Sequence, residues 1–266
     1  MNHYKATKKE VIPSSFSKGN QIKWLVSDCW IKQDYLGYEA LAEVVSSILC
    51  SCISNISYIP YDFCSVNYNG VTYKDCCYSE NMLMKNEELV LVGKLLEDSN
   101  FNMEKLKGMG VVDGIKIVCK TLCNLGVVDL TTYICKTILL DSLILNEDRH
   151  LYNIAVIKKS SGKYRLSPIF DNGGALLSDL KDYPLINDNS INMRHVSSKP
   201  FSSDFSKQVN GALNIHKEPL IIDYSMLCDK LESFNTDLYS SDIVARCKDV
   251  LRFRLKCSEG KTWIKM

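Results

Sequence analysis

Two hydrophobic patterns divide the chain into unequal parts. In the first third, short runs rich in β-branched and aromatic residues alternate with turn residues, which is typical of strands. These runs are residues 22–26, 29–32, 63–68 and 71–78. Asp28 marks a turn between the first two, and Asn69-Gly70 predicts a tight hairpin between the last two. One helix is predicted at residues 38–50, where apolar residues recur at every third or fourth position.

Helical spacing dominates from about residue 87 onward. The predicted helices are residues 89–98, 112–125, 130–146, 204–213, 224–234 and 241–255. Gly126 is placed to end the second of these helices, and Asp129 is placed to cap the third. Two short strands are expected at residues 153–158 and 164–168, whereas residues 172–199 show no regular pattern.

Together these elements predict an α+β fold with two lobes. A β-rich N-terminal lobe would comprise residues 1–84, although its first 20 residues are polar and show no strand or helix pattern. A mainly helical C-terminal lobe would comprise residues 85–266. The apolar share of 46% and the charged share of 24% are those of a globular protein, which argues against disorder and against a coiled coil.

The charges of the chain nearly cancel. The 32 Lys and Arg residues face 31 Asp and Glu residues, so no overall field attracts nucleic acid or an anionic membrane. The N-terminus has no apolar leader, and no run of about 18 uncharged apolar residues occurs. We therefore expect a soluble, cytoplasmic protein with neither a membrane nor a nucleic-acid partner.

The cysteines do not have the spacing of a metal site. The chain has 12 cysteines, but it has no Cys-x-x-Cys pair and only 4 histidines. We expect reduced thiols that pack as small hydrophobic side chains.

The candidate chemistry lies in residues 146–153, Asn-Glu-Asp-Arg-His-Leu-Tyr-Asn, between an apolar helix and a strand. Asp148 and Asn153 have the Asp-to-Asn spacing of a kinase catalytic loop, and Asp171 follows in Phe-Asp-Asn-Gly-Gly. Phosphoryl transfer needs a carboxylate at the acceptor hydroxyl and hard oxygen ligands for Mg²⁺. Asp148 would orient and deprotonate the hydroxyl, and Asn153 and Asp171 would bind the metal.

The Asn-x-Asp-Arg-His-x-x-Asn loop followed by Pro-x-x-Asp-x-Gly resembles the HipA-like Ser/Thr kinases, in particular their compact members. The resemblance implies a two-lobed protein-kinase-like fold, ATP and Mg²⁺ as cofactors, and phosphorylation of Ser or Thr in a protein, with autophosphorylation as an option. It also implies that an antitoxin-like or other regulatory protein could be a partner. By position, Asp148 matches the catalytic aspartate, and Asn153 and Asp171 match the metal ligands. Asp141 matches a supporting hydrogen-bonding position, and His150 receives no catalytic role.

The N-terminal third should supply the lysine that binds the ATP phosphates. Lys32 ends a predicted strand and precedes the helix, as this lysine does in kinases. Glu43, far enough into the helix, is the expected ion-pair partner of Lys32, and Glu39 is the alternative. Lys23 and Lys18 are the rival lysines.

Two further segments are candidates for nucleotide binding. Residues 14–20, with Gly19, could cover the phosphates through backbone N–H groups, although the three-glycine pattern of a phosphate loop is missing. Glu80 and Asn81 lie where the link between the lobes is expected, and their backbone would bind adenine.

Two other functions remain open from the sequence. A kinase acting on a lipid or a small molecule would need the same three residues, because positioning chemistry barely depends on the acceptor. A pseudokinase or binding module is the other alternative, and it would predict that the base or a metal ligand is missing. ATP turnover that is lost on Asp171→Ala would separate an enzyme from a binding module.

Overall fold

The N-terminal strands form one twisted sheet. The computed structural model describes residues 1–12 and 21–266, so Gly19 and Lys18 lie outside the described residues. In the described part, the five-stranded sheet consists of β1 (Asn2–Ala6), β2 (Lys23–Val26), β3 (Cys29–Gln33), β4 (Asp62–Tyr68) and β5 (Val71–Glu80). The spatial order is β1-β4-β5-β3-β2, with β1 parallel to β4 and the other pairs antiparallel. The hairpin predicted at Asn69-Gly70 is confirmed, and both residues have positive φ.

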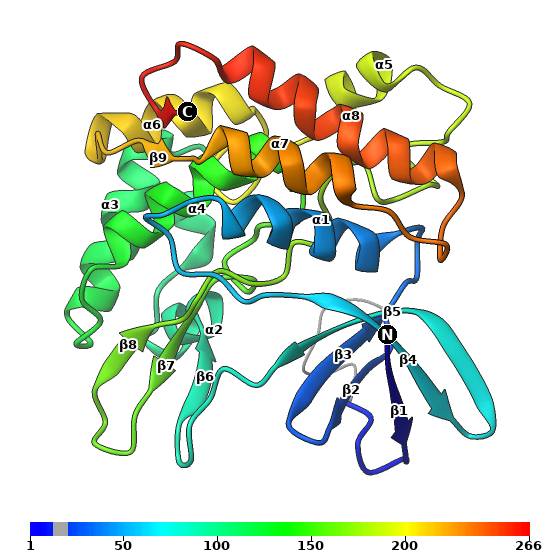
Figure 1. The fold of residues 1–266 in the computed structure, drawn as a ribbon. Helices are drawn as coiled ribbons and strands as arrows, with labels where there is room; N and C mark the ends of the chain where they lie inside the picture. Colours follow the sequence, from blue (N-terminus) through cyan, green and yellow to red (C-terminus); the bar gives the residue numbers. More distant parts are fainter. Residues whose placement is uncertain (13–20) are drawn as a thin grey trace.

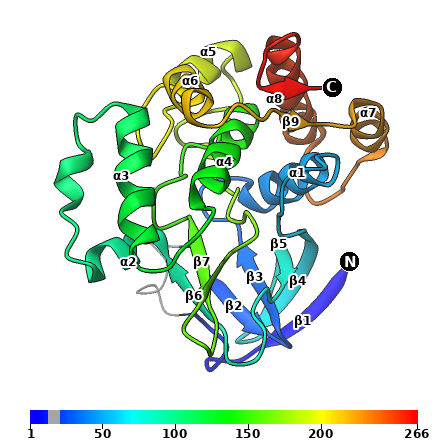
Figure 2. The ribbon, with the colours of Figure 1, turned by 90° about the vertical axis from the view of Figure 1, so that its left-hand side faces the viewer.

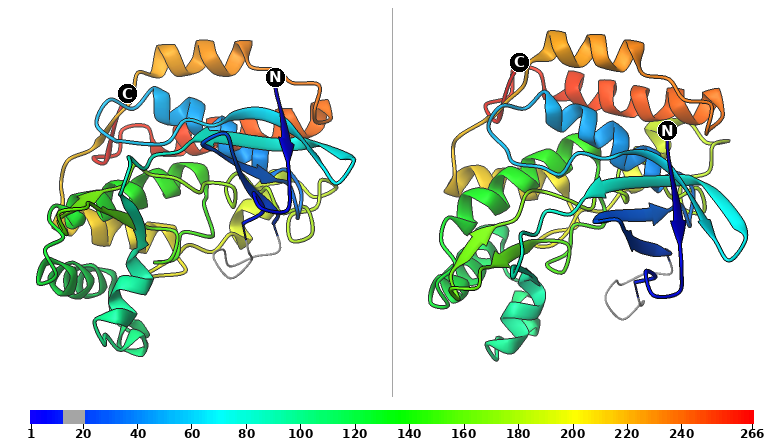
Figure 3. Two further views of the ribbon diagram at one scale, coloured as in Figure 1. Left: turned by 90° about the horizontal axis from the view of Figure 1, so that it is seen from below. Right: turned by 60° about the horizontal axis from the view of Figure 1, so that its bottom comes forward.

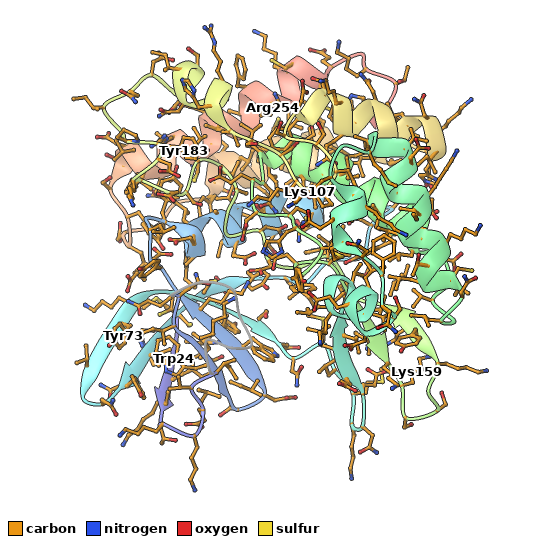
Figure 4. All side chains as sticks on the ribbon, turned by 180° about the vertical axis from the view of Figure 1, so that it is seen from behind. Trp24, Tyr73, Lys107, Lys159, Tyr183 and Arg254 are labelled. Atoms are coloured by element: carbon orange, nitrogen blue, oxygen red, sulfur yellow. The ribbon has the colours of Figure 1, made fainter. Side chains whose placement is uncertain are left out.

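The two faces of this sheet have different chemistry, because side chains alternate along each strand. One face holds a small apolar core that includes Trp24, Ile31 and Cys76. Trp24 and Tyr73, labelled in Figure 4, stack there with ring centroids 5.7 Å apart. Lys32, next to Ile31, takes the opposite face, which is covered by the helix that follows β3.

That helix, α1 (Glu39–Ser51), joins the sheet to the rest of the molecule. It lies between the five-stranded sheet and the helices α7 (Tyr224–Ser233) and α8 (Ser241–Ser258), which it contacts (Figure 1). Leu41, Val45 and Leu49 are fully buried in the main core. The apolar stripe predicted for this helix therefore faces the C-terminal part of the chain.

The C-terminal part is mainly helical, and a second sheet lies beside the first, below the helices (Figure 3). The second sheet has the order β6-β7-β8. The elements of the C-terminal part are, in chain order, β6 (Glu88–Leu91), α2 (Val92–Asp98), a 3₁₀ turn (Met103–Leu106), α3 (Val111–Cys123), α4 (Leu130–Ile144), β7 (Ala155–Lys158), β8 (Tyr164–Leu166), α5 (Asn189–His195), α6 (Phe205–Ile215), β9 (Leu220–Ile221), α7, α8 and β10 (Ile264–Lys265). Figure 2 shows α4 in the interior, between α3, α6 and α1. The expected α+β arrangement, β-rich at first and helical afterwards, is confirmed.

Four local predictions need correction. The stretch 172–199, expected to be irregular, contains the short helix α5, which the Asp188 side chain caps by accepting a hydrogen bond from the Ser190 N–H. Residues 89–91 are strand rather than helix, because β6 pairs with β7 and the helix begins only at Val92. The unbroken apolar run there does not distinguish a buried strand from a helix. Residues 2–6, which are polar, form the edge strand β1, of which only Ala6 is buried. Asp129 precedes α4 with positive φ, but its side chain makes no capping hydrogen bond.

Other expectations hold. The cysteines are free thiols and most are buried, as expected for packed, reduced side chains. Gly126, with positive φ, follows the end of α3. Across residues 1–12 and 21–266, none of the helices has both the length and the apolar character needed to cross a membrane. The division of the chain at residues 84 and 85 stays a prediction.

Candidate active site

Lys32 is the centre of a buried ion cluster between the sheet and α1. Its Nζ lies 2.5 Å from Glu43 Oε1 on α1 and 2.7 Å from Asp171 Oδ1. Lys32 is only 7% exposed, and its ammonium also lies 4.9 Å from the centre of the Tyr61 ring. The ion pair predicted between Lys32 and Glu43 is thus present. The other oxygen of Glu43 accepts a hydrogen bond from the Asn172 backbone N–H, 2.8 Å away.

The cluster keeps its members charged. Burial alone would raise the pKa of Asp171, but the ammonium groups of Lys32 and Lys23 hold it well below its usual range. Burial alone would lower the pKa of Lys32, but Asp171 and Glu43 hold it well above the ordinary value. A buried lysine without these carboxylates would tend to lose its proton, so the two carboxylates keep the Lys32 ammonium charged.

The other lysine and glutamate candidates have different positions. Lys23 is the cross-strand partner of Lys32 on β2, so both lysines are on the face of the sheet that meets α1. Glu39 does not reach Lys32. Its carboxylate instead accepts hydrogen bonds from the backbone N–H groups of Tyr35, Leu36 and Gly37, and so it fixes the turn that leads into α1.

Arg149 holds the loop of residues 146–153 to the segment that follows β8. Its guanidinium pairs with Asp141 of α4, with Nε to Oδ2 at 3.0 Å, and both side chains are almost fully buried. Nη1 donates to the backbone carbonyls of Asn153 and Phe170, and Nη2 donates to Asn172 Oδ1. The hydrogen-bonding role expected for Asp141 is present. Because Arg149 binds the carbonyls of both Asn153 and Phe170, the residue before Asp171, it fixes the spacing between Asn153 and Asp171.

Asp148 is held from several sides. Its N–H donates to Asn146 Oδ1 at 3.1 Å, and Asn153 Nδ2 donates to its backbone carbonyl at 2.8 Å. Its carboxylate lies 3.0 Å from Lys199 Nζ and 3.3 Å from Asn153 Nδ2. The carboxylate stays about half exposed.

His150 lies next to Asp148, but its side chain is not hydrogen-bonded to the Asp148 carboxylate. Its Nε2 is 3.8 Å from the Asp148 carboxylate, and its buried Nδ1 has no hydrogen-bond partner among the described residues. Burial lowers the pKa of His150, and this effect exceeds the opposite effect of Asp148. The side-chain hydrogen bonds that hold this loop are made by Arg149 and Asn146.

Among solved structures, the chain is similar to the proinflammatory kinase CtkA of Helicobacter pylori. The TM-score is 0.63 at 18% identity, and the match covers 95% of this chain and 94% of CtkA. The chain therefore has the same two-part kinase fold as CtkA, with a β-rich first part and a mainly helical second part. This confirms, for the fold, the resemblance predicted from the catalytic-loop motif.

Two more solved structures match at lower TM-scores. One is HipA of Shewanella oneidensis, in a structure of its toxin–antitoxin system with HipB and operator DNA, with a TM-score of 0.46 and 12% identity over 93% of this chain and 62% of HipA. The other is hydra Fam20 with sugar, with a TM-score of 0.42 and 13% identity over 92% and 81% of the two chains. At such scores neither defines the fold. No family model and no curated protein sequence matches the chain.

In this kinase fold, the oxygen donors of Asn153 and Asp171 suit a hard cation. One Asp171 oxygen binds Lys32, and the other has no hydrogen-bond partner in the described part of the chain. Asn153 turns its Nδ2 toward Asp148, which leaves its Oδ1 without a partner among the described residues. Carboxylate and amide oxygens that are not otherwise engaged are the ligands Mg²⁺ takes, with water and phosphate oxygens completing its shell. The residues present therefore fit the metal.

The predicted adenine-binding segment ends β5. Glu80 is paired with Cys29 in the sheet, and the Asn81 N–H donates to the Asp28 carbonyl at 2.9 Å. The Asn81 side chain bridges Asp28 and the Trp30 indole. The backbone N–H of Asn81 is thus already engaged, and the adenine-binding role of Glu80 and Asn81 stays a prediction.

Sequence reasoning missed two features of the site. Arg149 and Asn172 bind each other, and the motif contains both, but only the fold shows that they meet. Lys199 reaches Asp148 from 51 residues away in an irregular segment, and no local pattern marks it.

Proposed function

We propose that the protein is a kinase that transfers the γ-phosphate of ATP, with Mg²⁺, to a Ser or Thr hydroxyl of a protein. One observation supports this most strongly: Lys32 joins Glu43 and Asp171 in one buried cluster, and Arg149 ties that cluster to the Asp148–Asn153 loop. The choice of Ser or Thr in a protein rests on the sequence resemblance.

Each residue then has a distinct task. Lys32 would bind the phosphates of ATP, with Glu43 holding its ammonium in place. Asn153 and Asp171 would hold Mg²⁺, which neutralises phosphate charge as the transfer proceeds. Asp148 would accept a hydrogen bond from the acceptor hydroxyl, orient it and take its proton. Gly19, in residues 14–20, remains a candidate for covering the phosphates.

The test is transfer of labelled γ-phosphate with Mg²⁺ to a generic Ser/Thr acceptor such as dephosphorylated casein. We expect Asp148→Asn to lower the rate about 10²–10⁴-fold with nearly unchanged Mg²⁺·ATP affinity, because it removes only the base. Asp171→Asn should abolish transfer and also weaken Mg²⁺-dependent ATP binding. Exposed Asp237→Asn is the matched control and should behave as wild type. Wild-type rates in either active-site variant, or no nucleotide binding by the wild type, would refute the proposal.

A further inference from the structure

A turn after α5, residues 198–203, is tied down more firmly than a surface loop requires. Ser198 donates from its hydroxyl to the Ser202 carbonyl at 2.7 Å and from its N–H to the Ser203 carbonyl at 3.0 Å. Buried Gln208 of α6 binds both the Lys199 carbonyl and the Phe201 N–H. These bonds fix the backbone on each side of Lys199.

The turn is also packed against α3. A Cβ on Gly114 would lie 2.7 Å from the Phe201 ring, so the ring can sit there only because residue 114 is glycine. Phe201 is thereby held as firmly as the backbone around Lys199.

The side chain that this turn presents is Lys199, whose Nζ lies 3.0 Å from Asp148 Oδ1. Both side chains are about half exposed, and an exposed ion pair contributes only about 0–1 kcal/mol to stability. Folding stability therefore does not account for the rigid support of this lysine. A catalytic role at the Asp148 carboxylate does account for this support, because catalysis requires the Lys199 ammonium to be held in a fixed position.

Other cations near Asp148 are already engaged. Lys32 binds Glu43 and Asp171, and buried Arg149 binds Asp141, backbone carbonyls and Asn172. Burial lowers the pKa of His150, which favours its neutral form. In the described part of the chain, Lys199 is the cation in hydrogen-bonding contact with the Asp148 carboxylate.

We propose that Lys199 is a catalytic residue that contacts the transferred phosphoryl group on its acceptor side; the inference rests on the proposed kinase function. In the transfer, the acceptor oxygen forms a bond to the γ-phosphorus, the bond from that phosphorus to the β–γ bridging oxygen breaks, and ADP leaves. The hydroxyl proton goes to Asp148. Negative charge is then spread over the equatorial phosphoryl oxygens, where the Lys199 ammonium stabilises it.

The test compares Lys199→Met, Lys199→Arg and the control Lys207→Met, an exposed lysine on α6. Removing one such donor should lower kcat about 10²-fold. The KM for ATP and the Mg²⁺·ATP affinity should stay near wild type, because Lys32 and the metal site remain. Lys199→Arg should restore much of kcat, and Lys207→Met should leave it unchanged. An unchanged or raised kcat in Lys199→Met, while the wild type transfers phosphate, would overturn the role of Lys199 alone.

A second measurement does not depend on turnover. Calorimetry compares the binding of Mg²⁺·ADP with that of Mg²⁺·ADP plus aluminium fluoride, a mimic of the transferred phosphoryl group, in the presence of the acceptor protein. Lys199→Met should weaken the fluoride complex at least about 10-fold while leaving ADP binding unchanged. Equal affinities in wild type and variant would refute the inference. A wild type that binds no nucleotide would refute the proposed function and the inference with it.

Discussion

At the scale of single residues, the position of Asp148 depends on a glycine. A Cβ on Gly174 would lie 2.9 Å from the Asp148 Cβ, so a side chain there must push the carboxylate away. Since displacing a reacting group by about 1 Å can cost about 10²-fold, we expect Gly174→Ala to lower kcat by that order. The control is Gly110→Ala, because a Cβ on Gly110 meets nothing within 4 Å.

Steady-state kinetics and thermal unfolding of both variants check this prediction. Gly174→Ala should remain folded, because its backbone conformation is open to alanine and only the contact with Asp148 changes. Full activity in Gly174→Ala would show that Asp148 is not where the reaction takes place.

The residues that could be predicted from the sequence are those whose partners are close along the chain. Asp148 and Asn153 are five positions apart in one loop, and they meet in the structure as the spacing requires. The Lys32–Glu43 pair spans a strand end and the second turn of a helix. The kinase-like position of Lys32 and the depth of Glu43 in the helix suggested this pair, with Glu39 as the alternative. Lys199 could not be found in this way, because its contact with Asp148 depends on how the chain returns after α5.

At the scale of elements, the entry into α1 is held by a buried carboxylate. Asp34 accepts hydrogen bonds from the Ala40 N–H at 2.6 Å and from the Tyr239 hydroxyl at 2.7 Å. Burial raises the pKa of Asp34 to about 7, because it outweighs these bonds, and the nearby carboxylates of Glu39 and Asp75 raise it further.

This shift predicts a pH dependence of stability. Below about pH 4, Asp34 is protonated in the folded and the unfolded chain alike. Between about pH 4 and pH 7 the unfolded chain ionises first, so the folded chain holds the extra proton and stability falls as pH rises. Above about pH 7 this contribution is constant. We expect the free energy of unfolding of Asp34→Asn to rise, relative to that of the wild type, by on the order of 4 kcal/mol across that window.

Urea unfolding at a series of pH values measures the difference. Asn at position 34 still offers an acceptor to Ala40 and a donor to the Tyr239 oxygen, so the comparison isolates the ionisation. If the free energies of unfolding of wild type and Asp34→Asn change with pH in parallel, Asp34 titrates normally in the folded protein. Asp237→Asn, at an exposed position, should leave the shape of the curve unchanged.

Elements could be predicted where the pattern of apolar and turn residues was compatible with only one type of secondary structure. The helix at 38–50 and the hairpin at Asn69-Gly70 were found because periodicity and turn chemistry agreed. The strand β6 was mistaken for helix because Leu89 to Val92 are all apolar, and only the pairing with β7 decides between the two. Similarly, the mostly polar sequence of β1 does not indicate a strand, and only its parallel pairing with β4 shows that it is one.

At the scale of the whole molecule, the site is assembled from both halves of the chain. Lys32 comes from the sheet, Glu43 from a helix buried in the main core, and Asp171 from the segment after β8. Composition and motif predicted a β-rich lobe and a helical lobe, but they could not show that α1 packs on both the five-stranded sheet and the helices α7 and α8 (Figure 1). A ligand that contacts these elements together should therefore stabilise the whole fold rather than one lobe.

Thermal unfolding with nucleotide tests that coupling. With Mg²⁺·ATP at about 100 times its Kd, the folded state should gain about 2.7 kcal/mol. For a chain of this size, that gain raises Tm by about 5 °C. The shift should disappear with EDTA, which removes the metal, and in Asp171→Asn, which replaces the charged carboxylate ligand with a neutral amide. It should persist in Asp148→Asn, where only the base is lost. A shift of equal size without Mg²⁺, or one retained in Asp171→Asn, would place the nucleotide away from the cluster of Lys32, Glu43 and Asp171. Two separate unfolding transitions, of which only one moves, would show that the halves of the molecule respond independently despite the shared packing of α1.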